Sequence, residues 1–69
     1  KRLTLVRHAK SDWGDPDLAD FDRPLNGRGR RNAPEMAARL AEAGLRPTLM
    51  LTSPALRALA TARAFAKAL

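Results

Sequence analysis

Residues 3–11 decide the fold, and they read Leu3-Thr4-Leu5-Val6-Arg7-His8-Ala9-Lys10-Ser11. The opening run of Leu, Thr and Val is long enough for a buried strand and too short for an ordinary helix. It leads directly into the single histidine of the sequence, which is flanked by cations. Ligands of open α/β sheets bind outside the carboxyl ends of the strands. The stretch therefore predicts a first strand over residues 1–7 with a ligand site at its end.

A helix is predicted after the loop that follows this strand. Asn26 is a good N-cap, and Gly44 is the natural residue just past the helix end. Pro34 lies within the pattern and predicts a kink or a restart of the helix. The helix is indicated by a stripe of apolar residues at helical spacing: Ala33, Met36, Ala37, Leu40 and Ala41.

A second strand and a second helix complete the chain. Residues 48–52 read Thr-Leu-Met-Leu-Thr and predict the strand. Ser53 and Pro54 follow at once, as N-cap and first helical residue of a helix that runs toward Leu69.

The order strand, helix, strand, helix predicts an α/β fold with a mainly parallel sheet. Helices normally cover both faces of such a sheet, which gives a three-layer αβα architecture. Two parallel strands are too few for a stable sheet. We therefore expect residues 1–69 to be the N-terminal part of a single larger domain whose C-terminal half is absent from this sequence.

Composition narrows the function classes. The sequence has no cysteine and one histidine, so we expect no metal site and no other cofactor. No apolar run approaches the ~20 residues that span a bilayer, and we expect no membrane partner. The absence of cysteine fits a reducing compartment, so a cytoplasmic location is expected. A formal net charge of +6 favours an anionic partner. Nothing in the sequence indicates an oligomeric state.

The ends of the two predicted strands carry the groups with chemistry. Adjacent parallel strands would bring Arg7 and His8 close to Arg57 and to the start of the last helix. Arginines and a helix N-terminus bind phosphate, and histidine is a nucleophile near neutral pH. These residues predict a phosphoryl-transfer site built around His8.

Three blocks of sequence resemble a known family. They are residues 5–9 (Leu-Val-Arg-His-Ala), residues 22–26 (Asp-Arg-Pro-Leu-Asn) before a helix with Gly29, and residues 53–62 (Ser-Pro-Ala-Leu-Arg-Ala-Leu-Ala-Thr-Ala). In this order they resemble the histidine phosphatase (phosphoglycerate mutase-like) superfamily. The opening Arg-His-Ala-Lys-Ser-Asp-Trp of residues 7–13 is most similar to the bacterial SixA-type phosphohistidine phosphatases.

The resemblance implies a role for each candidate residue. His8 would be the nucleophile and would form a phosphohistidine enzyme intermediate. Arg7 and Arg57 would bind the phosphoryl group, and Ser11 would donate a hydrogen bond to it. Lys10 is a further candidate of the same pocket. A second pocket histidine and the general acid are implied beyond Leu69. The expected partner is a phosphorylated substrate, with phosphohistidine in a protein favoured.

Two alternatives remain open at this stage. A small-molecule phosphomonoesterase or mutase on the same fold is the first, although Gly14 stands where mutase-like members carry a phosphate-binding Asn. The second is a basic nucleic-acid-binding module, suggested by the net charge. The predicted helices are separated by a strand rather than by a short turn, which disfavours this second alternative, and we expect no nucleic-acid partner.

Overall fold

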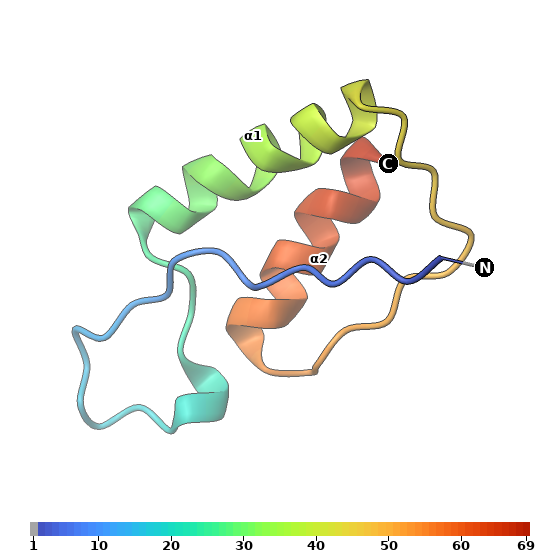
Figure 1. Cartoon of the computed structure of the whole chain (residues 1–69). Coiled ribbons are helices and arrows are strands. Elements are labelled where there is room, and N and C mark those ends of the chain that lie inside the picture. The colour runs from blue at the N-terminus through green and yellow to red at the C-terminus, as the bar shows by residue number, and fades with distance from the viewer. Residues whose placement is uncertain (1) are drawn as a thin grey trace.

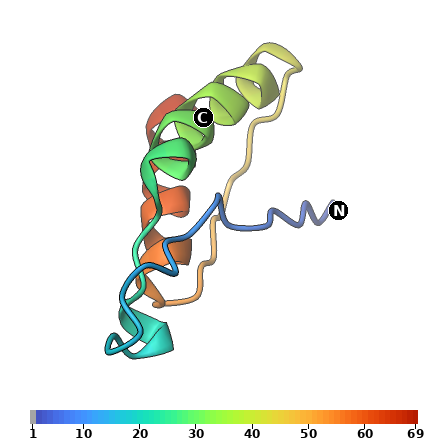
Figure 2. The ribbon, with the colours of Figure 1, turned by 90° about the vertical axis from the view of Figure 1, so that its left-hand side faces the viewer.

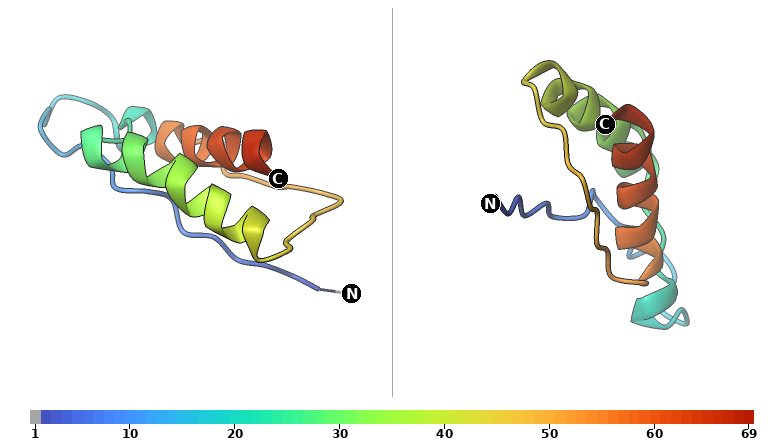
Figure 3. Two further views of the ribbon diagram at one scale, coloured as in Figure 1. Left: turned by 90° about the horizontal axis from the view of Figure 1, so that it is seen from above. Right: turned by 90° about the vertical axis from the view of Figure 1, so that its right-hand side faces the viewer.

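The computed structural model describes residues 2–69, which form a short 3-10 helix and two α-helices (Figure 1). The 3-10 helix η1 spans Asp20–Asp22, α1 spans Gly27–Glu42 and α2 spans Leu56–Ala68. The two α-helices pack against each other. The N-terminal segment and the connection between α1 and α2 both lie on one side of this helix pair (Figures 2 and 3). The arrangement is one helical layer with extended chain along one of its faces.

Helix α1 begins and ends where the sequence predicts. The side chain of Asn26 accepts a hydrogen bond from the backbone N–H of Gly29 at 2.8 Å, as an N-cap should. At the other end Ala43 is the C-cap, and Gly44 has a φ of 95°. Only glycine adopts this left-handed conformation without strain, so Gly44 stops the helix.

Pro34 lies inside α1 without ending it. A proline within a helix removes one backbone hydrogen bond and leaves the carbonyl four residues earlier without its partner. Here both Pro34 and Arg30 are exposed, so water can reach the carbonyl group of Arg30. The predicted interruption at Pro34 therefore does not divide the helix.

A glycine allows the N-terminal segment to lie close to α1. A Cβ atom on Gly29 would lie 2.1 Å from the carbonyl oxygen of Lys10, closer than any real contact. The same oxygen accepts a hydrogen bond from the N–H of Asn26 at 2.9 Å. Gly29 therefore lets the backbone of the N-terminal segment lie directly on the first turn of α1.

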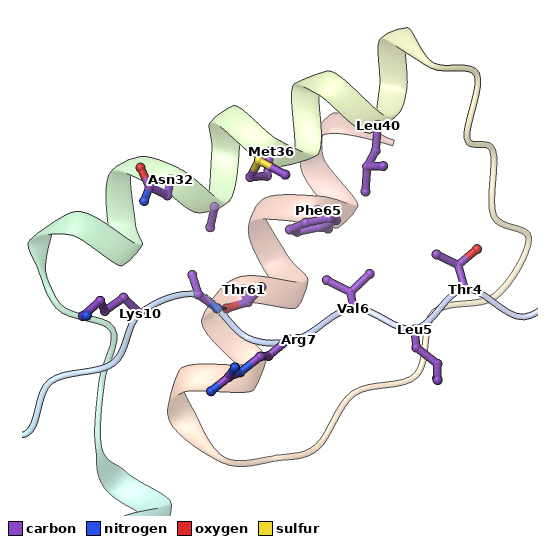
Figure 4. A pocket seen from close by; sticks show the side chains of 12 residues that line it. Thr4, Leu5, Val6, Arg7, Lys10, Asn32, Met36, Leu40, Thr61 and Phe65 are labelled. Atoms are coloured by element: carbon purple, nitrogen blue, oxygen red, sulfur yellow. Dashed lines mark hydrogen bonds between the residues drawn. The ribbon is translucent and has the colours of Figure 1, made fainter.

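The core between the helices is small. It is formed mainly by Ala33 and Ala37 of α1 and by Thr61 and Phe65 of α2, all buried. A cavity of about 380 Å³ lies between residues 4–10 and the two helices, and Figure 4 shows the side chains around it. The N-terminal segment thus crosses the helix pair without filling the space beneath it.

Helix α2 begins later than predicted. Its first residue is Leu56 and its N-cap is Ala55, which has non-helical backbone angles and provides no side-chain cap. Ser53 does not cap the helix; its hydroxyl accepts a hydrogen bond from the N–H of Ala55 at 3.2 Å. The serine closes a local turn before the helix, so the predicted N-cap at Ser53 and helical Pro54 are wrong by two residues.

The two predicted strands are not confirmed. Residues 2–7 and 48–52 have no strand assignment, and residue 1 lies outside the described residues. A strand needs a hydrogen-bonded neighbour, and these two segments do not pair with each other. Burial on both faces is also not found, because Leu5 and Leu51 are 85% and 84% exposed. The pairing present among residues 2–69 is an antiparallel bridge between Ser11 and Leu25.

Candidate active site

The last residue of the first predicted strand and the four residues after it share one surface hollow with a tryptophan. This hollow, called the His8 cavity below, has a volume of about 450 Å³. It is lined by Arg7, His8, Ala9, Lys10, Ser11 and Trp13. Four of the five predicted site residues therefore surround the same space, with three side chains that carry or can carry a positive charge.

The ring of His8 is held by its own backbone neighbour. Its Nδ1 lies 2.8 Å from the carbonyl oxygen of Ala9. A carbonyl oxygen only accepts hydrogen bonds, so Nδ1 must carry the proton of this contact. In the neutral ring Nε2 then has the free electron pair. His8 therefore presents the nitrogen that a nucleophile needs.

Thr61 connects the His8 segment to α2. Its hydroxyl oxygen accepts a hydrogen bond from the N–H of Ala9 at 3.0 Å, and the hydroxyl donates to the carbonyl oxygen of Arg57 at 2.8 Å. Thr61 itself is buried, and the two bonds are partly buried. This residue links the peptide after His8 to the first turn of α2. A polar residue within an apolar stripe, four residues after Arg57, is the sequence signal that would have identified it.

Ser11 is buried and engaged by an arginine that the sequence analysis did not single out. The Nη1 of Arg23 donates to the Ser11 hydroxyl oxygen at 2.5 Å. The hydroxyl hydrogen of Ser11 is not used in this contact and is available to a ligand. Arg23 is itself buried, and its guanidinium carbon lies 3.4 Å from the ring centroid of Trp13. The sequence signal that could have identified Arg23 is its position before Pro24 in the block of residues 22–26 that resembles the family.

Arg57 is held outside the His8 cavity. Its Nη1 donates to the backbone oxygen of Asp20 at 2.6 Å, and its Nη2 lies 3.0 Å from the Asp20 carboxylate. The predicted grouping of Arg57 with Arg7 and His8 around one space is thus not found. The Thr61 side chain connects the backbone of Arg57 to that of Ala9, the residue after His8.

Asp20 also binds Arg23. Its Oδ1 accepts from Arg23 Nη2 at 2.9 Å and from Nε at 3.2 Å. The hydrogen bond from Arg23, and then the contact with Arg57, hold the pKa of the Asp20 carboxyl group below its ordinary value. The carboxylate therefore stays ionised at neutral pH and joins two arginines.

Comparison with known proteins decides the family. The profile of the Histidine phosphatase superfamily (branch 1) matches residues 3–69. The chain belongs to the histidine phosphatase superfamily.

Two relatives of this histidine phosphatase chain show how much of the family it covers. A crystal structure from Agrobacterium tumefaciens, assigned as the phosphohistidine phosphatase SixA, matches with a TM-score of 0.84 and 40% identity. The match covers 90% of this chain and 40% of that protein. An uncharacterized chloroplastic protein of Arabidopsis thaliana is 46% identical over 57 residues, which are 83% of this chain and 26% of the relative. The chain therefore spans less than half the length of both.

These relatives confirm some predictions and contradict one. The predicted resemblance to SixA-type histidine phosphatases, over only part of their length, is confirmed, and the structural match places the chain in an α/β fold. The predicted cytoplasmic location is wrong by this comparison, because the curated relative is described as chloroplastic. Absence of cysteine describes a redox environment and does not distinguish one compartment from another.

The described residues of this histidine phosphatase chain contain neither a cluster of metal ligands nor a membrane-spanning helix. Within residues 2–69, no three carboxylate, imidazole or thiol side chains gather as a metal site would require. Neither α-helix in this range has the length and apolar character needed to cross a bilayer.

Proposed function

We propose that the protein is a phosphatase that removes the phosphoryl group from phosphohistidine in a partner protein, with His8 as the nucleophile. The observation that carries this proposal is the orientation of His8. Its Nδ1 is bound to the Ala9 carbonyl oxygen at 2.8 Å, and the ring lines a cavity with Arg7, Lys10 and Ser11. A neutral imidazole beside cations and a hydroxyl group suits attack on a phosphoryl group.

The reaction has two steps. The electron pair of His8 Nε2 forms a bond to phosphorus while the P–N bond to the substrate imidazole breaks. The electron pair of that bond goes to the leaving nitrogen, which takes a proton from solvent. Water then attacks the phosphorylated His8, the P–Nε2 bond breaks, and inorganic phosphate leaves with the His8 nitrogen restored. Each step exchanges one bond to phosphorus for another.

Cationic and hydroxyl groups would neutralise the transferred phosphoryl group. Arg7 and Lys10 border the cavity, and the Ser11 hydroxyl has a hydrogen to donate. Arg57 uses two N–H groups on Asp20, and a guanidinium has five. Because Arg57 lies outside the His8 cavity in this structure, the proposal requires its side chain to turn from Asp20 toward the phosphoryl group before the remaining donors can bind it. The charge of Lys10 would act mainly by attracting the anionic substrate.

The lining of the His8 cavity within residues 2–69 supplies a nucleophile and cations, and the resemblance implies that the general acid lies beyond Leu69. None of the six residues around it is a carboxylic acid. An alkoxide leaving group needs a positioned acid to protonate it. Imidazole is a much better leaving group and needs less help. The groups of the described chain could therefore act on a P–N bond with less help than a P–O ester would need from the rest of the protein.

The test is the behaviour of the His8→Gln variant of the complete protein. With a phosphohistidine protein labelled in the phosphoryl group, we expect the wild type to show an acid-labile phosphoenzyme that maps to His8. The variant should show no label, and turnover should fall about a thousandfold or more, because the nucleophile is gone. Lys67→Gln, an exposed change in the last turn of α2, serves as the control and should behave as the wild type.

Two results would contradict the proposal. One is turnover of His8→Gln close to that of the wild type. The other is a wild type that hydrolyses phosphoglycerate or phosphoserine peptides faster than phosphohistidine, which would favour an ester phosphatase.

A further inference from the structure

Trp13 lies at the edge of the His8 cavity with most of its surface open. It is one of the six lining residues, and 75% of its surface is exposed. A tryptophan that served only to anchor its loop would be packed against the rest of the molecule. The indole ring is instead available to whatever enters the cavity.

The ring is nevertheless held in place. The guanidinium carbon of Arg23 lies 3.4 Å from the ring centroid, at the distance of a close cation–π contact. Arg23 is itself fixed by the Ser11 hydroxyl at 2.5 Å and by the Asp20 carboxylate at 2.9 Å. One face of the indole ring is thus covered and positioned by a buried side chain. Since most of the residue is exposed, the opposite face is the surface offered to a ligand.

The cavity divides by chemistry into two parts. Arg7 and Lys10 attract the negative charge of a phosphoryl group, and His8 presents its nucleophilic nitrogen to it. Trp13 offers a flat aromatic face, which attracts planar groups by stacking. A ligand that fits both parts carries a planar ring bonded directly to its phosphoryl group. Phosphohistidine has this structure, whereas aliphatic phosphates do not.

We propose that Trp13 is a specificity-determining residue that stacks against the imidazole ring of a phosphohistidine substrate. This inference rests on the proposed function, because it requires the phosphoryl group to be directed at His8. The ring of the substrate lies against the uncovered indole face while Arg23 supports the other. Because Trp13 is already positioned, little side-chain freedom is lost when the substrate binds.

The experiment compares two substrates that share a P–N bond. Phosphohistidine has the ring, and phosphoramidate has only an amino group in its place. In the complete protein, Trp13→Ala should lower kcat/KM for phosphohistidine about tenfold. Its kcat/KM for phosphoramidate should stay within about twofold, because no ring is present to stack. Trp13→Phe keeps an aromatic face and should recover most of the loss.

An equal loss with both substrates would overturn the inference, since Trp13 would then act only through the fold. No loss with either substrate would overturn it as well. A separate binding measurement keeps the test independent of turnover: phosphohistidine is titrated into His8→Gln with and without Trp13→Phe, and tryptophan emission is recorded. We expect phosphohistidine to change the emission only when Trp13 is present, and phosphoramidate to leave it unchanged. Absence of the phosphohistidine signal overturns the stacking role, whereas activity that survives His8→Gln overturns the proposed nucleophile instead.

Discussion

At the scale of single residues, the carboxylate of Asp20 has the most connections in the site. It binds Arg57 at 3.0 Å and Arg23 at 2.9 Å, and Arg23 in turn holds Ser11 and Trp13. Asp20 itself is exposed to solvent, so each ion pair alone is weak. Its effect is to restrict two long side chains at once. Asp20 thus fixes the arginine that holds Ser11 and Trp13 at the cavity wall, without lining the cavity itself.

Replacing Asp20 with Asn should therefore weaken anion binding. Without the negative charge Arg23 holds Ser11 and Trp13 less firmly and Arg57 samples more conformations, so that anion binding must order these side chains. We expect the dissociation constant for inorganic phosphate to rise about two- to fivefold in the complete protein, measured by isothermal titration calorimetry. Asp22→Asn is the matched control, because Asp22 lies in the same 3-10 turn and its side chain makes no hydrogen bond within residues 2–69. Tighter phosphate binding by Asp20→Asn would show that the carboxylate competes with phosphate.

The site residues differ in how well their places followed from sequence. Arg7, His8, Lys10 and Ser11 were predicted to share a site, and they line one cavity because they are neighbours in the chain. The position of Arg57 depends on a contact with Asp20, which is 37 residues away in sequence. No periodicity or motif spacing encodes such a pairing between a loop and a helix. The catalytic and binding roles of these site residues are predictions that the variants described here test.

At the scale of elements, the backbone contact between Gly29 and Lys10 positions the N-terminal segment. A Cβ atom on residue 29 would lie only 2.1 Å from the carbonyl oxygen of Lys10. The neighbouring residues His8 and Ser11 belong to the site. Their place relative to α1 therefore depends on the absence of one side chain.

Gly29→Ala should destabilise the complete protein by about 1–3 kcal/mol, the usual cost of forcing a group into packed backbone. Gly27→Ala in the same helix is the control. Its Cβ would lie 3.4 Å from the flexible Arg31 side chain, and alanine favours the helix, so no loss is expected. Urea unfolding of both variants measures the difference. Equal free energies of unfolding for the two variants would show that the segment moves freely away from α1.

Helix ends were predictable where a side chain or glycine defines them locally. The Asn26 cap and Gly44 are of this kind. The start of α2 was missed by two residues because Ser53 has two local options, a helix cap and a turn, and the hydrogen bond to Ala55 shows the turn. A local sequence pattern cannot establish a strand, because a strand exists only when a neighbouring segment forms hydrogen bonds with it.

At the scale of the whole molecule, the apolar residues of the predicted strands define an uncovered face. Leu3, Leu5, Leu49 and Leu51 are all exposed on the two extended segments. The helix pair lies on one side of these segments (Figures 2 and 3). In an α/β fold such residues are covered by neighbouring strands and by a second helical layer. The match to the SixA structure covers only 40% of that protein, so the rest of its chain is long enough to supply such strands and helices.

A polypeptide of these 69 residues should accordingly bind the dye ANS strongly and self-associate. Leu5→Gln combined with Leu51→Gln removes two large apolar side chains from the uncovered face and should lower both ANS fluorescence and the associated fraction. Leu18→Gln is the matched control, because Leu18 is exposed in the loop before η1 and outside the two extended segments. Fluorescence and light scattering after size-exclusion chromatography provide the measurements. A monomeric polypeptide that does not increase ANS fluorescence would contradict this prediction. It would mean that the exposed leucines are covered in solution, since they would otherwise bind the dye.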